Sequence, residues 1–206
     1  MGQEDCTALT GAEKRRAARI DQVLDAAADC FVEYGFHSAG MAKIAKRAGM
    51  SVGHIYHYFE SKEAIISAIV DRESALAAER FSEFDAIDPA ELAEAMAEKA
   101  TSSLMDKSEL MQSVLNLEML AEGQRNPAIA EIIQKHDQYI REWLYHLIGD
   151  KLGLQDPEAR TDMLMVLFSG IGARVLRHPE IDRENLAPVM RETILRILKP
   201  GPVCNK

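Results

Sequence analysis

The chain has 206 residues, of which 47% are hydrophobic and 28% are charged, and its formal net charge at pH 7 is −9. This length suffices for one large or two small domains with a sizeable core. We expect neither a secretory leader nor a membrane span, because the first twenty residues are polar and the longest uncharged apolar run, Met163–Ala173, is well short of the roughly twenty residues that a span needs.

The first predicted helix covers residues 13–34 and ends at Gly35, which tolerates the backbone that often follows a helix. Its apolar residues recur at intervals of three and four, and they are Ile20, Leu24, Ala27 and Phe31. This spacing is typical of an amphipathic helix that packs one face on a core. We expect residues 1–11 before it, and residues 200–206 at the other end, to be disordered.

A helix-turn-helix is the next predicted element. Its two short helices are expected at 41–47 and 52–58. Ala45 is small enough for two helices to cross closely, Gly49 tolerates the positive φ of a sharp turn, and Ile55 is an inward-facing apolar anchor. Ser51 stands at the N-cap position of the second helix, where its hydroxyl accepts a backbone N–H. Because the second helix of such a unit can lie in a DNA major groove, we predict a DNA-reading unit here.

Six further helices begin at capping residues, and no strand pattern is found. Ser61 caps a helix that runs to about Phe84, and Ser108 starts one that ends at Gly123. An Asx residue followed by proline predicts three more; the pairs are Asp88-Pro89, Asn126-Pro127 and Asp156-Pro157, opening helices at 89–106, 127–148 and 157–177. The last helix runs from Asp182 to about Lys199. The fold class is therefore all-α with about nine helices, divided into residues 1–62 and 63–206.

The charge is distributed unevenly over these two parts. Residues 1–62 hold eight basic and eight acidic residues, so the whole −9 lies in residues 63–206. The cations around the helix-turn-helix are Lys43, Lys46, Arg47 and Lys62. Between residues 34 and 62 the sole acid is Glu60. We expect this local basic patch to hold phosphates while the acidic remainder keeps the molecule soluble.

Residues 15–63 resemble the DNA-binding domain of the tetracycline-repressor (TetR) family of bacterial regulators. The motifs that carry the resemblance are the helix with Ile20, Ala27 and Phe31, then Gly35-Phe36, Ile44-Ala45, Ala48-Gly49-Met50-Ser51, Gly53, Ile55-Tyr56-His57-Tyr58-Phe59 and Ser61-Lys62-Glu63. The remainder is similar to the family in helix count and layout alone. One departure is that Ala39 and Gly40 stand where the family commonly has a capping Thr or Ser that also meets a phosphate.

The resemblance implies a set of DNA-binding residues, which are Lys43, Ser51, Val52, Gly53, His54, Tyr56, His57, Tyr58 and Lys62. His54 is the long polar side chain at the start of the recognition helix, so we assign base readout to it. The tyrosine tips and Lys62 are expected on phosphates, which position the protein without specifying sequence. Phe59 is expected in the core. His54 and His57 lie one turn apart as a metal pair would, but no third ligand is evident, and we predict no metal.

The apolar run Met163–Ala173 predicts a dimer. A helix that is apolar on all faces must be covered on both sides, so we infer one face on its own domain and one on a second subunit. The predicted seam residues are Met165, Ser169, Gly172, Ala173, Leu186, Met190, Ile194 and Ile197. The alternative is a helix fully buried within one chain. The family resemblance implies the same homodimer, and a two-fold dimer requires a roughly palindromic operator.

Residues 63–206 are also expected to bind a small-molecule effector, chiefly because the resemblance implies it. Ten methionines favour an adaptable pocket. The predicted lining residues are Met105, Met111, Leu115, Glu118, Met119, Trp143, Met163 and Phe168. Glu118 and Glu122 are candidates to meet a cationic ligand; the alternative is that all of these are ordinary core or surface residues. We expect the ligand to change the tilt of the helix after Ser61 and so relieve repression; activation by the ligand is the other possibility.

Two rival functions were weighed against this regulator. An enzyme is disfavoured, because the sequence has no Glu-x-x-His pair, no GxSxG, no Walker A loop and no cofactor motif. A helical ligand-binding or interaction protein without DNA binding remains the alternative, given the acidic charge and the missing capping Thr. Cys6, Cys30 and Cys204 are odd in number and far apart, which indicates the reducing cytoplasm, and Cys30 is expected to be a small buried hydrophobe.

Overall fold

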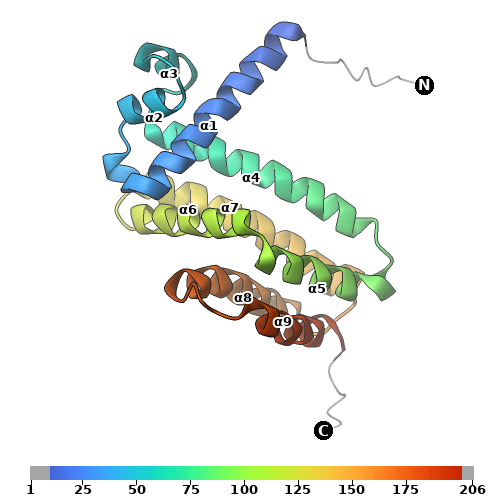
Figure 1. Ribbon diagram of the computed structural model, residues 1–206. Helices are drawn as coiled ribbons and strands as arrows, with labels where there is room; N and C mark the ends of the chain where they lie inside the picture. The colour runs from blue at the N-terminus through green and yellow to red at the C-terminus, as the bar shows by residue number, and fades with distance from the viewer. Residues whose placement is uncertain (1–9, 201–206) are drawn as a thin grey trace, which may run out of the picture. The chain divides into compact units, whose positions relative to one another are not determined.

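The computed structural model describes residues 10–200, except for the side chains of residues 107–111. Over this part the chain forms nine α-helices and one π-helical turn, without a strand, which confirms the all-helical prediction (Figure 1). The disorder predicted for the two ends falls largely on residues outside the described part. Every described helix is too short or too polar to cross a bilayer.

The contacts divide the chain into two compact units. One extends to Ile69 and the other begins at Val70, so the junction lies inside the helix α4, which runs from Lys62 to Asp85. A continuous helix therefore contributes its first two turns to one unit and its remaining turns to the other.

The first unit contains α1 (Gly11–Ser38), α2 (Met41–Arg47), α3 (Val52–Tyr58) and the start of α4. Its core is formed by side chains with at most 2% exposure, which are Val23, Leu24, Ala27, Cys30, Phe31, Ala39, Ile44, Ala45, Ala48, Ile55, Ile65, Ile66 and Ile69. Gly35 has φ of 73° and interrupts α1 where the sequence predicted its end, but one further turn follows to Ser38. The ring of Phe36 in this turn lies 5.4 Å from that of Phe31 and closes the core.

The turn between α2 and α3 has the conformation that the residue types predict. Gly49 has φ of 64°, a left-handed conformation that other residues adopt at a cost. The amide of Met50 donates to the carbonyl of Ala45 at 2.9 Å, and both Ala45 and Ile55 are buried. The helix-turn-helix geometry predicted from Ala45, Gly49 and Ile55 is therefore confirmed.

The second unit is a layered helical bundle. Besides α4 it contains α5 (Pro89–Met105), α6 (Lys107–Gly123), α7 (Pro127–His146), the π-helical turn η1 (Leu147–Lys151), α8 (Pro157–Arg177) and α9 (Arg183–Leu198). The helices pack in the pairs α5 with α9, α6 with α7, and α8 with α6, α7 and α9, and Figure 1 shows α8 and α9 side by side. The buried cluster at its centre draws on α5, α7, α8, α9 and η1.

Most predicted caps are present in the structure. Asp88 and Asn126 accept from the amides of Ala90 and Ala128, at 2.8 and 3.2 Å. Asp156 is a correction: it adopts a left-handed conformation with φ of 55° and makes no side-chain cap bond, although Pro157 still begins α8. The sequence analysis also missed η1, which extends α7 by a wider turn.

Candidate nucleic-acid interface

The helix α3 buries one side chain and exposes most of the others. Ile55 is fully buried, whereas Val52, Gly53 and His54 at its N-terminal end are exposed. The Oγ of Ser51 accepts from the amide of His54 at 3.2 Å, so the predicted N-cap is confirmed. The first turn of α3 is thus a fixed, outward-facing surface, which is what a helix needs in order to enter a groove of a duplex.

Three ring side chains of α3 contact one another. The ring of Tyr58 lies 5.3 Å from that of His54 and 5.4 Å from that of His57, and Tyr58 is half-buried. Tyr56 is 53% exposed. Phe59 is 8% exposed and lies in the core, as predicted. The described residues contain no group of three or more potential metal ligands.

The two lysines assigned to DNA both lie over aromatic rings. The Nζ of Lys43 is 4.4 Å from the ring centroid of Tyr34, and the Nζ of Lys62 is 4.2 Å from that of Phe36. Lys62 also donates to the carbonyl of Phe36 at 2.7 Å. Since an ammonium has three donors, Lys62 keeps capacity for a phosphate while it fastens the end of α1 to α4. The sequence analysis did not predict the contact of Lys43 with Tyr34. The feature that could have indicated it is an aromatic residue directly before Gly35, where α1 is interrupted.

A compact ion network involves Arg47, one of the four cations that the sequence grouped around the helix-turn-helix. Its guanidinium pairs with Glu33 and lies 3.5 Å from the carboxylate of Asp29. Hydrogen bonds from Tyr34 and from Arg47 lower the pKa of Glu33, and the bond to Glu33 raises the pKa of Arg47. Arg47 therefore joins α1 to α2, and the two carboxylates offset its charge. Burial raises the pKa of the Cys30 thiol beside it, in accord with a packed, unreactive residue.

The residues predicted to line an effector pocket lie in different environments. Leu115 and Met119 are buried, Glu118 and Trp143 are half-buried, and the side chain of Met111 lies outside the described residues. The exposed members of the set are Met105, Met163 and Phe168, at 47%, 55% and 39%. The seven described members of this set therefore do not gather around one interior space of the single chain.

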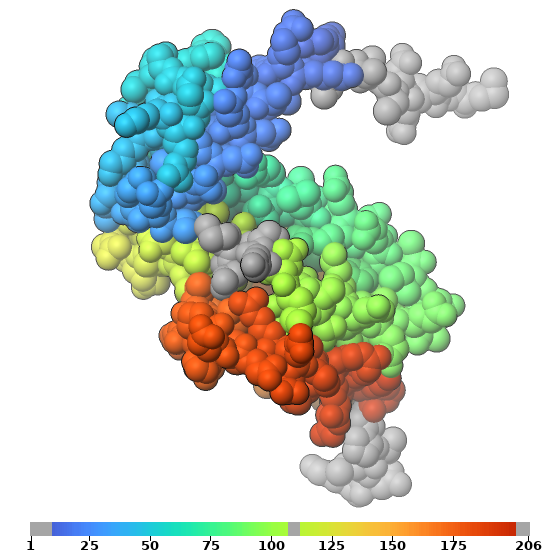
Figure 2. All heavy atoms as spheres, viewed as in Figure 1, coloured from blue at the N-terminus to red at the C-terminus, as the bar shows by residue number. Residues whose placement is uncertain are grey.

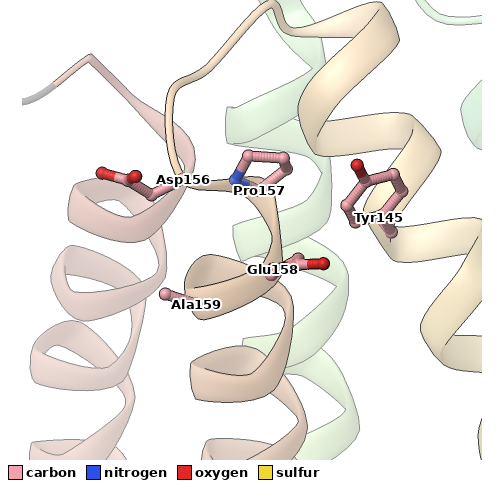
Figure 3. A pocket seen from close by; sticks show the side chains of 5 residues that line it. All are labelled: Tyr145, Asp156, Pro157, Glu158 and Ala159. Carbon is pink, nitrogen blue, oxygen red and sulfur yellow. The ribbon is translucent and has the colours of Figure 1, made fainter.

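Two surface hollows flank the start of α8. One, of about 390 Å³, is lined by Tyr145 of α7 and by residues 156–159 (Figure 3). In Figure 3 the side chain of Glu158 points toward Tyr145, while that of Asp156 points away. The other, of about 320 Å³, includes Met163 as the one residue from the predicted pocket.

An aromatic cluster joins α4 to α7. The rings of Phe81 and Trp143 are stacked, with centroids 3.8 Å apart and an angle of 4° between the planes, and Tyr139 and Phe84 lie within 6.0 Å of this stack. The Nε1 of Trp143 is buried and has no hydrogen-bond acceptor among the described residues. A buried donor without an acceptor is costly, so this indole marks a place where a ligand acceptor would be stabilised.

The predicted seam residues also divide into separate groups. Met190 and Ile194 are buried within the chain, where α9 packs on α5, so a seam with a second chain has to use other residues of α9. Gly172 faces Ser113 of α6, because a Cβ at this position would lie 2.4 Å from the Ser113 Oγ. Ala173 and the partly buried core residues Met165, Leu186 and Ile197 offer limited surface, whereas Ser169 is exposed. On α8 and α9 the large exposed apolar residues are Met163, Val166, Phe168 and Val189.

Comparisons with known proteins agree with this architecture. Residues 23–69 match the family described as bacterial regulatory proteins, tetR family, and residues 89–199 match the BetI-type transcriptional repressor C-terminal family. The HTH-type transcriptional regulator UidR of Escherichia coli strain K12 is 36% identical over 170 residues, covering 81% of this chain and 83% of UidR.

Solved structures give the same result at the level of the fold. Salmonella enterica GusR superposes with a TM-score of 0.71 at 27% identity, covering 93% of this chain and 99% of that one. Bacillus subtilis FadR, solved in complex with stearoyl-CoA, superposes with a TM-score of 0.63 at 22% identity, covering 87% and 99% of the two chains.

Proposed function

This chain belongs to the TetR family of bacterial transcriptional regulators, and from that premise we propose that it is a homodimeric repressor which binds a palindromic operator and is released by a small molecule. Its site of action is the chromosome in the cytoplasm. The observation that carries the proposal is the first turn of α3, where Ser51 caps a helix that exposes Val52, Gly53 and His54 around a buried Ile55.

The DNA contacts follow from the chemistry of this surface. His54 is the polar side chain nearest the N-terminal end of α3, so it reads base edges, and Gly53 lets the backbone approach the duplex closely. Tyr56, His57 and Tyr58 hydrogen-bond phosphate oxygens, which fix the register. Lys43 and Lys62 add charge at the flanks, where their aromatic neighbours orient the ammonium groups.

The dimer forms through the exposed face of α8 and α9. Val166 of α8 and Val189 of α9 are 65% and 61% exposed, and the exposed Ser169 of α8 is small enough for helices to approach closely. An apolar surface of this kind on adjacent helices is stabilised by covering it with a second copy. The dimer brings two α3 helices to successive turns of a duplex, which requires half-sites about 34–36 Å apart or a multiple of that spacing.

Sedimentation of the full chain tests the seam. We expect the wild-type protein to sediment as a dimer of 22.9 kDa chains, and Val166→Glu to sediment as a monomer, because a charge would be buried in an apolar interface. Leu76→Glu is the matched control, since Leu76 is an apolar residue of α4 that is 46% exposed and lies outside the seam. A dimeric Val166→Glu protein would place the interface elsewhere.

The effector acts through α4, which begins in the first unit and ends in the second. The C-terminal end of α4 is held by Lys151, whose Nζ donates to the carbonyls of Phe84 and Asp85 at 2.9 and 2.6 Å. The stack of Phe81 on Trp143 lies one turn away, so a ligand that accepts from the Trp143 indole would bias the position of α4. The ligand shifts DNA binding by its differential affinity for the two positions of α4.

Trp143 is the single tryptophan of the chain, so its fluorescence reports binding at this place. Stearoyl-CoA, the ligand in the FadR structure, is a suitable first compound. A compound that changes Trp143 fluorescence and lowers DNA affinity along the same saturation curve would support the coupling. A compound that saturates the fluorescence change without altering DNA affinity would contradict it.

Selection from a pool of random duplexes tests the central proposal. The full chain at 0.1 M salt should enrich a rough palindrome, and the enriched duplex should then bind with a strong dependence on salt. A pool that shows no enrichment would overturn the regulator proposal and favour a helical ligand-binding protein that does not bind DNA.

A further inference from the structure

The first turns of α1 form a helix with no buried face. Residues 11–19 are exposed at every position, Ile20 is half-buried, and Val23 is the first residue of α1 in the core. Figure 1 shows this blue end of α1 standing clear of α2 and α3, and Figure 2 shows it as a projecting arm. The N-terminal amides are satisfied locally by a capping box, in which the Thr10 hydroxyl accepts from the amide of Glu13 at 3.3 Å and the Thr10 amide donates to the Glu13 carboxylate at 2.7 Å.

The sequence of this arm is unsuited to packing on its own chain. The core stripe of α1 runs backward from Ala27 through Val23 and Ile20 at intervals of three and four, and the next position on it is Arg16. A cation thus stands where continued packing would need an apolar side chain. The arm has four cations in six residues, which are Lys14, Arg15, Arg16 and Arg19. In a chain of net charge −9, this is a concentrated positive surface.

A hydrogen bond made by Gln22, just after the arm, fixes the base of the arm to the helix-turn-helix. The Nε2 of Gln22 donates to the carbonyl of Ala48 at 2.7 Å, and Ala48 is the residue that ends α2. Arg19 lies one turn before Gln22 and donates to its Oε1 at 2.7 Å, and Arg15 lies one turn further along the same face. At 1.5 Å per residue, Arg15 is about 10 Å along the axis from Gln22. The row of cations therefore leads away from the turn that precedes the recognition helix.

We infer that the arm binds the phosphate backbone of the operator beside the groove that α3 enters, through Lys14, Arg15, Arg16 and Arg19. The inference rests on the proposed function, because it extends the DNA surface of the same unit. The occupant is duplex DNA, because a row of closely spaced cations that continues the DNA-binding surface complements the closely spaced phosphates of a duplex. The contacts are sequence-independent, since side chains on phosphates carry no base information.

The test compares two double variants of the full chain on the duplex that the wild-type protein enriches from the random pool. Arg15→Gln/Arg16→Gln removes two charges from the arm and keeps residues that favour a helix. Lys99→Gln/Lys135→Gln removes the same charge from exposed positions of α5 and α7 and serves as the control. Arg19 is left in place because it contacts Gln22, which anchors the arm.

The arm variant should lower the slope of log K against log salt by about 1.8 per chain bound, from about 0.9 for each lost phosphate contact. At 0.1 M salt this corresponds to a loss of affinity of up to about 60-fold, equal for all sequences. The control should leave the slope unchanged, and circular dichroism should show equal helix content in all three proteins.

The outcomes separate this inference from the proposed function. If the wild-type protein enriches a duplex and the arm variant matches it in affinity and slope, the arm does not contact DNA. If both double variants weaken binding equally, the effect is one of net charge and the inference fails. If the wild-type protein enriches nothing, the regulator proposal fails and the arm inference falls with it.

Discussion

Replacing Gly172 by alanine should destabilise the second unit, although alanine favours helices. The added Cβ would lie 2.4 Å from the Oγ of Ser113 and 2.8 Å from its Cβ, so α6 and α8 would have to move apart. Overpacking of this kind costs about 1–3 kcal/mol, and the better helix propensity of alanine returns up to about 1 kcal/mol. We therefore expect a net loss of roughly 1 kcal/mol in the free energy of unfolding.

Gly170→Ala is the matched control on the same helix. Gly170 is exposed, and a Cβ there would meet nothing within 4 Å in the single chain. This variant should gain up to about 1 kcal/mol from helix propensity. The difference between the two variants removes the propensity contribution, so it reports the overpacking alone, at about 1–3 kcal/mol.

Guanidinium denaturation at two protein concentrations tenfold apart measures both changes and separates folding from dimer association. Two results would refute the reasoning. Equal stabilities of the alanine variants, within about 0.5 kcal/mol, would mean that α6 and α8 do not approach closely at Gly172. If the loss in free energy of unfolding for Gly172→Ala depended on protein concentration, Gly172 would lie in the seam between subunits, as the sequence analysis predicted.

Three further changes test the first unit and the α4–α7 contact. His54→Ala should relax base preference at one or two positions, at about 1–3 kcal/mol each, when the selection is repeated; uniform weakening of all sequences would make His54 a phosphate contact. Ser51→Ala should lower the free energy of unfolding by about 1 kcal/mol, with Ser51→Asp close to wild type in thermal melts, because both residues cap α3. His136 is hydrogen-bonded to Ser74 at 2.8 Å, and burial lowers its pKa in the folded protein. Below about pH 6.5 the unfolded chain therefore binds more protons than the folded one, and acid favours unfolding. The free energy of unfolding of the wild-type protein should fall between about pH 7.5 and 5.5, and that of His136→Gln should fall less.

The helix-turn-helix was predictable because its steric requirements are local. A close helix crossing requires a small residue, a left-handed turn favours glycine, and an anchor must be apolar, so Ala45, Gly49 and Ile55 specify the geometry within eleven residues. The ends of α2 and α3 coincide with the predicted 41–47 and 52–58 for the same reason. The roles of the exposed residues on α3 remain predictions, since exposure alone does not distinguish base readout from phosphate contact.

The features that the sequence analysis missed depend on residues far apart in the chain. Lys151 binds the end of α4 through carbonyls 66 and 67 positions earlier, and no periodic pattern around Lys151 indicates this. Asp156 has the residue type of an N-cap, but its backbone is left-handed, so the side chain does not reach the first turn of α8. A local pattern predicts that a helix begins there and does not predict how its first amides are satisfied.

The apolar run of α8 shows where sequence reasoning stops for this chain. A helix that is apolar on all faces must pack against neighbours on two sides. The sequence does not indicate which residues face which neighbour. The structure resolves one of them: Leu164 and Val175 are buried in the core of their own unit, and Gly172 meets Ser113 of α6. Val166 is 65% exposed on the same helix, so no described residue of the chain covers it, and we propose that a second copy does so. A small residue such as Gly172 permits close approach by any neighbour, and its size therefore predicted a tight contact without identifying the helix that makes it.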